Sequence, residues 1–494
     1  MQYFGLSDVG VFAALLVASF VIFYPQNRAF RRRGIDPGVL SLKIWPARIW
    51  FLLKGHDITQ KAYREAKNVP YLLQTLVDDV LVLPPRFLPE LQLQPGTKLS
   101  ASHALVASVL GQYSGVDVIL KDRQANDISR TQLTKSLPAI IPPIAEKVES
   151  ILLEKLSQSF TPIKVQDLVA ETVLRTTLLT FVGPDLAENA ELQKAVTDFS
   201  NVVRDIAICL LLIPTFMRPW VYPILPPKFR MRRLHATVRR ILFSTPESRN
   251  KDGGVPTMVR HFVATSKVFN EDEIVSKFLT LIAAALHTMT MSTVHALIDL
   301  CAYPQYIFDL RDEVCRSLSA DNNDGTWGLD QIHRLKRFDA FLKESQRFNP
   351  PNYLSFDRMA MDSITLSDGT NICKGQLISM PAGPMAMDPE FHENPQSFDA
   401  SRFLPHKTFL SDEKLTRDLE FVGIEKGNVH WGAGRFTCPG RWYASAVMKC
   451  IIGSILMKYD ITFPEGQQER LPNVYLDIVI EPNPKQKVMF QPRD

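Results

Sequence analysis

HWGAGRFTCPGRWYA, residues 430–444, is the stretch of this chain on which the interpretation of the rest depends. Gly432 and Gly434 permit backbone turns that a side chain would resist, and Gly440 lets the chain lie close against a flat group. Cys438 stands where the N-terminal amides of the following helix can stabilise a thiolate. A thiolate held in this way is a good ligand for a soft metal ion. The stretch therefore predicts a glycine-rich loop that presents one anionic sulfur.

The same loop resembles the haem-binding signature of the cytochrome P450 family, which reads aromatic, Gly, x, Gly, x, Arg or His, x, Cys, x, Gly. The matching positions are Trp431, Gly432, Gly434, Cys438 and Gly440. The aromatic residue is usually Phe, and the basic residue is Phe436 here, so the neighbouring Arg435 is a candidate to replace it beside a haem propionate. The resemblance implies that Cys438 is the axial ligand of the iron of haem b. The alternative is a purely structural loop.

A second motif, KESQRF at residues 343–348, places Glu344 and Arg347 on one helix face because they are three positions apart. By itself such a pair is an ordinary surface salt bridge. Together with NPQSFDASRF (394–403), which contains Arg402, it resembles the Glu-x-x-Arg motif and the Phe and Arg segment of the same family. The resemblance implies that Glu344, Arg347 and Arg402 form a buried network that stabilises the cysteine loop.

Residues 271–302 predict a single helix, far longer than the usual length of about 11 or 12 residues, with Asn270 as its N-cap. Because its interior carries almost no charge, this helix is expected to cross the middle of the protein. Its segment AALHTM (284–289) resembles the oxygen-activating segment of the family, in which an acid precedes a threonine. The resemblance implies that the Thr288 hydroxyl binds iron-bound oxygen and relays protons; the alternative is a hydroxyl bonded only to its own helix. His287 replaces the acid and is either a variant proton donor or a core histidine.

Further candidate residues are less specific. The segment NDISRTQL (126–133) lies where the family has a helix with Trp-x-x-x-Arg, so Arg130 is a candidate partner of a haem propionate. An ordinary solvated arginine is the alternative, because Asn126 occupies the Trp position. Apolar side chains that belong either to a substrate pocket or to the core are Leu281, Ala285, Met289, Tyr353, Leu354 and Leu476.

Composition limits the class of protein. The chain has 494 residues, of which 46% are hydrophobic and 22% are charged, so it is neither disordered nor a multi-span membrane protein. Its net charge of +4 argues against a nucleic-acid partner. The cysteines include no C-x-x-C pair and no dense framework, which favours a reducing compartment.

The hydrophobic periodicity predicts a mainly α protein with a small β region, and the resemblance narrows this to the cytochrome P450 fold. Residues 69–85 predict a β-hairpin, residues 100–350 are mostly helical, and short strands follow before a last helix. Helix breaks are expected at Pro138, Pro142, Pro143, Gly183 and Pro184.

The N-terminal region predicts a membrane anchor. Residues 9–24 carry no charge and, with the apolar residues before Asp8, approach the roughly 20 residues that cross a bilayer. Arginines follow this run rather than precede it, which is unlike a cleaved signal and places the following chain in the cytosol. We therefore expect a single-pass anchor of the endoplasmic reticulum membrane in residues 1–27, a basic linker and approach helix in 28–68, and the catalytic domain in 69–494. The alternative is a buried core helix.

The stretch LLLIPTFMRPWVYPILPPKFRMRR (210–233) mixes aromatic, proline and basic residues. It is too broken to span a membrane. It is either an irregular internal connection or a second membrane contact, with Arg218, Lys228 and Arg230 near lipid headgroups.

Taken together, the resemblance implies a haem-dependent monooxygenase that uses O2 and NADPH-derived electrons. These electrons would come from NADPH-cytochrome P450 reductase in the same membrane, with cytochrome b5 as an optional second donor. The expected substrate is a bulky apolar small molecule, a terpenoid or related fungal secondary metabolite, because the chain is similar to fungal members of the ent-kaurene oxidase type. The alternatives are a haem-thiolate isomerase or dehydratase that needs no reductase, and a catalytically silent haem-binding protein.

Overall fold

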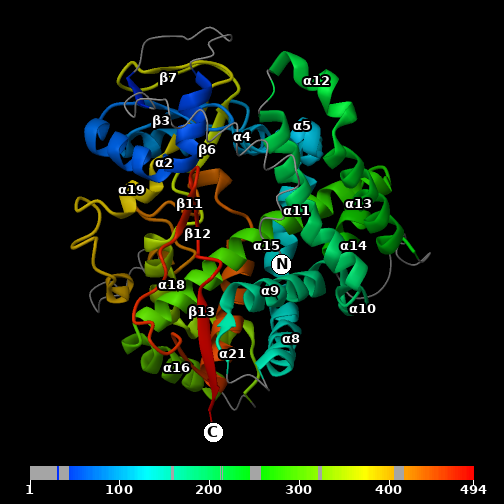
Figure 1. Cartoon of the computed structure of the whole chain (residues 1–494), viewed down its shortest axis with the longest axis vertical. Coiled ribbons are helices and arrows are strands. Elements are labelled where there is room, and N and C mark those ends of the chain that lie inside the picture. Colours follow the sequence, from blue (N-terminus) through cyan, green and yellow to red (C-terminus); the bar gives the residue numbers. More distant parts are fainter. Residues whose placement is uncertain are drawn as a thin grey trace.

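The computed structural model describes residues 30–32, 44–156, 161–211, 213, 215–244, 257–320, 325–404 and 417–493. The anchor predicted at residues 9–24 and most of the linker lie outside these residues. Figure 1 shows helices through most of the molecule and a small sheet, in blue and yellow, at one end. The expected mainly α fold with a small β region is therefore confirmed.

The helices fall into two groups by length. Those of eight residues or more are α2 (Ile44–Ala66), α4 (Ala101–Ser108), α8 (Leu137–Leu156), α9 (Val165–Val182), α11 (Ala190–Leu211), α13 (Pro226–Leu242), α14 (Met258–Thr265), α15 (Glu271–Ala302), α16 (Gln305–Leu318), α18 (Lys336–Phe348) and α21 (Arg441–Lys458). Shorter helices are α3 (Leu88–Leu91), α5 (Gly111–Ser114), α6 (Gln124–Asp127), α7 (Leu133–Lys135), α10 (Pro184–Ala187), α12 (Arg218–Val221), α17 (Leu329–Arg334) and α19 (Ala382–Ala386).

The main sheet brings the N-terminal hairpin together with the segment that follows residue 350. Its six strands have the order β1-β2-β3-β9-β6-β4. Their bounds are β1 (Phe30–Arg32), β2 (Tyr71–Gln74), β3 (Asp79–Val82), β4 (Leu99–Ser100), β6 (Ser355–Ala360) and β9 (Leu377–Met380). β2 and β3 are antiparallel, with Tyr71 opposite Val82, which confirms the hairpin predicted at residues 69–85.

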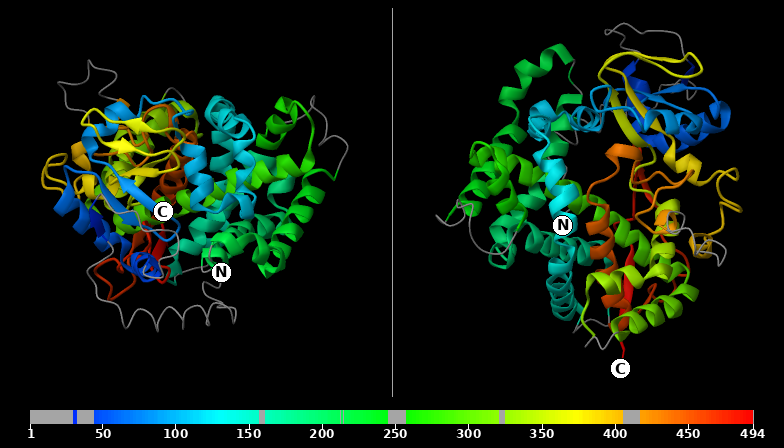
Figure 2. Two further views of the ribbon diagram at one scale, coloured as in Figure 1. Left: turned by 90° about the horizontal axis from the view of Figure 1, so that it is seen from above. Right: turned by 180° about the vertical axis from the view of Figure 1, so that it is seen from behind.

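Smaller sheets lie outside the main one and involve the C-terminal strands. β10 (Tyr459–Thr462), β13 (Lys487–Pro492) and β5 (Ile163–Lys164) form one of them, and β7 (Ile364–Thr365) pairs with β8 (Asn371–Ile372). β11 (Val474–Leu476) and β12 (Val479–Glu481) form a hairpin. Figure 2 shows from two further sides that the main sheet lies beside the helical part rather than beneath it.

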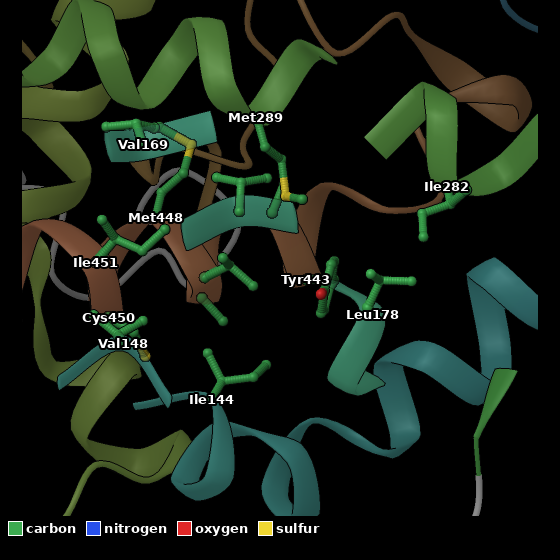
Figure 3. Close-up of a cluster of buried hydrophobic side chains, with 14 of the residues drawn as sticks. Ile144, Val148, Val169, Leu178, Ile282, Met289, Tyr443, Met448, Cys450 and Ile451 are labelled. Carbon is green, nitrogen blue, oxygen red and sulfur yellow. The ribbon is translucent and has the colours of Figure 1, made fainter. Parts of the chain in front are cut away.

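The helical core is built around α15, which has the bounds predicted for the long helix. Asn270 caps it, since its side chain accepts a hydrogen bond from the amide of Glu273. Side chains of α8, α9, α15 and α21 converge on one apolar cluster, in which Figure 3 labels Ile144, Val148, Val169, Leu178, Ile282, Met289, Tyr443, Met448, Cys450 and Ile451. Within the described residues, α15 alone is long and apolar enough to cross a membrane. Because it packs against α9, α11, α13, α18 and α21, it is a core helix.

Some of the predicted helix breaks are absent. α8 runs through Pro142 and Pro143, so the breaks predicted there are wrong. The break at Pro138 is confirmed, because α7 ends at Lys135 and Pro138 lies in the first turn of α8, where backbone amides have no helical partner. The buried apolar face of α8 outweighs the hydrogen bonds that Pro142 and Pro143 remove. The break at Gly183 and Pro184 is confirmed, since Gly183 has a φ of +89° and Pro184 begins α10.

Candidate active site

The cysteine loop runs into the N-terminus of α21 and is closed by its own backbone. The amide of Cys438 donates a hydrogen bond of 2.8 Å to the carbonyl of Trp431. Gly432 and Gly434 have φ values of +76° and +66°, in the left-handed region that favours glycine. A Cβ at Gly434 would lie 2.5 Å from the backbone oxygen of Gln92, so close packing also requires this glycine. Both glycines therefore shape the loop that carries the cysteine.

The sulfur of Cys438 lies at the start of α21, among donors suited to a thiolate. Burial raises the pKa of this thiol, whereas hydrogen bonds from the amides of Gly440 and Arg441 and the charge of Arg441 act to lower it. A metal cation in contact with the sulfur would remove its proton outright. A Cβ at Gly440 would meet no atom of the chain within 4 Å. The loop is thus open at Gly440, which fits a flat metal-bearing group.

Three arginines surround this loop without an ion-pair partner in the described part of the chain. Each donates a hydrogen bond to a backbone carbonyl of the loop, over 3.2 Å for Arg130, 3.0 Å for Arg441 and 3.4 Å for Arg358. Burial lowers the pKa of Arg358 to about 10, and its guanidinium lies 5.2 Å from the ring centre of Phe436. Nε of Arg441 is buried and lacks a hydrogen-bond partner among the described residues. This concentration of positive charge fits an anionic group.

Of the arginines at the loop, the sequence indicated Arg130 and Arg435 but not Arg358 or Arg441. Arg130 lies at the loop, where its partner is the backbone carbonyl of Arg435. The side chain of Arg435 itself is exposed. Arg358 was missed because it comes from β6, far from the loop in the chain, and only the fold brings it beside Phe436.

Glu344 and Arg347 of α18 are both fully buried and form a two-point ion pair. Nε and Nη2 of Arg347 donate to the two carboxylate oxygens of Glu344 over 2.7 and 2.8 Å. Arg402 and the amide of Asp399 donate to the same carboxylate, over 3.2 and 2.7 Å. Arg347 also donates to the backbone carbonyls of Ala386, Pro395 and Ser397. The pair is therefore no surface salt bridge, and it ties α18 to the segment 386–402, which precedes the cysteine loop.

The middle of α15 exposes one narrow stripe of residues. Ala284, His287 and Thr288 are exposed at the spacing of one helix face, although most of the helix is buried. The hydroxyl of Thr288 donates a hydrogen bond of 2.9 Å to the carbonyl of Ala284, so the bond to its own helix is present. Because this bond uses the hydroxyl proton, the oxygen of Thr288 keeps a lone pair for a donor outside the helix.

His287 is not a core residue, because its side chain is 57% exposed. Its Nε2 lies 4.0 Å from Oε1 of Glu481, the last residue of β12. Partial burial lowers the pKa of His287, the carboxylate of Glu481 opposes this shift, and the nearby charge of Arg204 on α11 adds to it. The imidazole is therefore more easily kept neutral than an ordinary histidine.

The candidates for an apolar pocket divide between the core and the surface. Met289 and Leu354 are 3% and 1% exposed and belong to the core, where Figure 3 shows Met289 among the packed side chains. Tyr353 is also buried, and its ring fills the space where Gly383 would carry a Cβ. Candidates that keep accessible surface are Leu281, Ala285 and Leu476.

Comparison with known proteins identifies the family. The family model for Cytochrome P450 matches residues 54–489. The cytochrome P450 monooxygenase olcJ of Penicillium canescens is 31% identical over 84% of this chain and 79% of its own length. Cytochrome P450 monooxygenase janP of Penicillium janthinellum is 31% identical over 92% of this chain and 88% of its own length. An ent-kaurene oxidase of Gibberella intermedia is 28% identical over 91% of this chain and 86% of its own length. The family implies a haem iron cofactor. With its helical fold and its cysteine loop at the start of α21, this chain belongs to the cytochrome P450 family and is a monooxygenase.

Proposed function

We propose that this cytochrome P450 oxidises a bulky apolar small molecule, a terpenoid or related fungal secondary metabolite, at a haem b held by Cys438. O2 is the oxidant, and NADPH-cytochrome P450 reductase delivers the electrons, with cytochrome b5 as an optional second donor. The observation that carries the proposal is the environment of the Cys438 sulfur. It accepts hydrogen bonds from two backbone amides and lies in a loop that is open at Gly440.

Different residues in and around the loop would hold the iron and the propionates of the cofactor. Cys438 binds the iron, and Arg130, Arg358, Arg435 and Arg441 are the candidates for the propionates, because guanidinium groups bind carboxylates through charge-assisted hydrogen bonds. The bound haem supplies the chemistry that activates dioxygen for insertion into a C–H bond. The protein binds the thiolate, orients the substrate, excludes water and delivers protons.

Two further sets of residues support this chemistry. The hydroxyl of Thr288 donates its proton to the carbonyl of Ala284, so its oxygen is free to accept a hydrogen bond. The donor would be a protonated group beside the open face of α15, the exposed stripe that contains Thr288. His287 is the neighbouring source of protons. The buried network of Glu344, Arg347 and Arg402 has a structural role, because it fixes the segment that leads to the cysteine loop.

The substrate class rests on relatives and on the open face of α15. Relatives named ent-kaurene oxidase and cytochrome P450 monooxygenase of fungi match most of the chain. Leu281 and Ala285, partly exposed on α15, offer apolar contact beside the reactive residues. An apolar molecule with one face near Thr288 fits these observations.

Membrane attachment is a separate part of the proposal. The short helical turns 215–217 (η4), α12 and 222–224 (η5) expose large apolar side chains, with exposed fractions of 69% for Phe216, 82% for Trp220 and 74% for Ile224. Arg218 and Lys228 lie next to them in the chain, and a mixture of aromatic and basic side chains suits a lipid interface. Figure 1 shows α12 at the outer end of the helical part. With the anchor at residues 9–24, this surface holds domain 69–494 on the cytosolic face of the endoplasmic reticulum.

Arg230 was expected near the headgroups as well. Its side chain is 50% exposed and forms an ion pair with Asp205 of α11 over 2.5 Å. The apolar part of the membrane contact is therefore assigned to the segment before α13, with Arg218, Lys228 and Arg230 at its basic edge.

Microsomes that contain this chain and a reductase test the proposal directly. We expect an oxygenated product from ent-kaurene, or from related diterpene hydrocarbons, that requires both NADPH and the reductase. Conversion of an oxygenated terpenoid at the same rate without the reductase would instead support the isomerase or dehydratase. A haem-containing chain that forms no product from these compounds would favour a silent haem-binding protein.

A further inference from the structure

The position before Thr288 carries a histidine, and the structure places a carboxylate beside it. Glu481 comes from the C-terminal hairpin, and its Oε1 lies 4.0 Å from Nε2 of His287. This separation is slightly too long for a direct hydrogen bond, but one bridging water or a small side-chain rotation closes it. β12 therefore brings a carboxylate beside residue 287, where the sequence itself has no acid.

The position of Glu481 is fixed by contacts to the same helix. The carbonyl of Ile480 bonds to Nε2 of His295, two turns along α15 from His287, over 3.3 Å. Nδ1 of His295 in turn receives a hydrogen bond of 3.0 Å from Arg470, which also pairs with Asp299 of α15. Because α15 bonds to Ile480 and to Arg470, which precedes the hairpin, the next residue after Ile480, Glu481, is held close to His287.

The charges around His287 come from two elements. Glu481 of β12 stabilises the protonated imidazole, whereas Arg204 of α11 and partial burial favour the neutral form. Glu481 is therefore the group that opposes loss of the proton from His287. Without it, the imidazole would be neutral over a wider range of pH.

We propose that Glu481 is a positioning residue that, with His287, forms a proton-donating dyad in place of the family's acid before Thr288. This inference rests on the proposed function. His287 takes one proton from the acid in bulk solvent, beside the carboxylate of Glu481, and passes one proton to the side of the site that holds Thr288. One proton thus moves from solvent into the site, no electron moves, and the dyad returns to its starting state.

The infrared stretching frequency of carbon monoxide bound to the reduced haem tests the dyad without any substrate. Its frequency responds to charge near the bound gas, so protonation of His287 should give one transition with pH. His287→Gln should abolish this transition. Glu481→Gln should move its midpoint to lower pH by about one unit, because a negative charge that favours the imidazolium is lost. Glu465→Gln, which alters an exposed carboxylate of the C-terminal region, is the matched control and should leave the midpoint unchanged.

The hydrogen peroxide released per NADPH gives a second readout, in variants that include an acid placed at residue 287. In turnover with ent-kaurene and reductase, Glu481→Gln should increase hydrogen peroxide released per NADPH, and the combined variant His287→Asp and Glu481→Gln should restore the wild-type ratio. A wild-type frequency that does not respond to pH, or a midpoint that Glu481→Gln leaves unmoved, would overturn the dyad. Absence of the thiolate-type carbon monoxide complex in the wild type would instead overturn the proposed function, and this is observed before any titration begins.

Discussion

Substitution of Arg347 by methionine should destabilise the protein far more than loss of an ordinary arginine. Arg347 and Glu344 are both 0% exposed, and the guanidinium also holds three backbone carbonyls of the segment 386–402. Arg347→Met leaves the carboxylate of Glu344 buried with only Arg402 and one backbone amide as partners. Breaking a buried pair from one side costs about 3–5 kcal/mol.

The expected change in melting temperature follows from the length of the chain. An unfolding entropy of about 2.1 cal/mol/K per residue gives about 1 kcal/mol/K for 494 residues, so each 1 kcal/mol lowers the melting temperature by about 1 °C. Arg347→Met should therefore lower it by about 3–5 °C. Differential scanning calorimetry at a fixed scan rate measures this difference.

The matched control is Arg239→Met on α13. Arg239 pairs with Asp272 over 3.0 Å, but the two side chains are 46% and 67% exposed. Such a surface pair contributes less than about 1 kcal/mol, so the expected decrease is about 1 °C or less. The double variant Arg347→Met and Glu344→Gln removes both buried charges and should be more stable, by about 1–3 kcal/mol, than the sum of the single effects predicts. Equal decreases for Arg347→Met and Arg239→Met, or additive effects in the double variant, would refute the reasoning.

Four other substitutions probe separate parts of the account. Thr288→Ala should lower the oxygenated product formed per NADPH by about 10²-fold and release hydrogen peroxide instead; tight coupling would contradict the role of its hydroxyl. Gly434→Ala should cost at least about 1–2 kcal/mol, measured by urea unfolding, because its φ is +66° and a Cβ would approach Gln92. A Cβ at Gly440 would meet no atom of the chain, so Gly440→Ala should leave the stability of the haem-free chain unchanged. It should lower the haem-to-protein ratio, because the methyl group would occupy space proposed for the haem. Trp220→Phe should remove part of the tryptophan fluorescence that brominated lipids quench in the reconstituted protein; unchanged quenching would place Trp220 outside the lipid.

Much of the fold was predictable because the decisive signals are local. The cysteine loop combines glycines that need unusual backbone angles with a cysteine before a helix, and both features are legible in consecutive residues. The helix at residues 271–302 was equally clear, since its N-cap and its uncharged interior act within one element. The family model and the relatives then confirmed the family that these motifs indicated.

The remaining errors come from interactions between elements. Pro142 and Pro143 predict a break, but packing of α8 in the core outweighs their local cost. For Met289 the sequence left a pocket residue and a core residue as alternatives, and only the neighbouring helices that cover it decide for the core. Arg358 and Glu481 could not be assigned from the sequence at all, because β6 and β12 bring them to the site from distant parts of the chain.

The central claim is that the sulfur of Cys438 binds the haem iron, and the absorption spectrum of the reduced, carbon monoxide-bound protein tests it most directly. The wild type should show the long-wavelength Soret band typical of thiolate-bound haem. Cys438→Ser should lose this band, whereas Cys450→Ser, which changes a buried core cysteine of α21, the helix after the loop, should keep it. A wild-type band at the position typical of histidine-bound haem, or a thiolate-type band that survives in Cys438→Ser, would contradict the account.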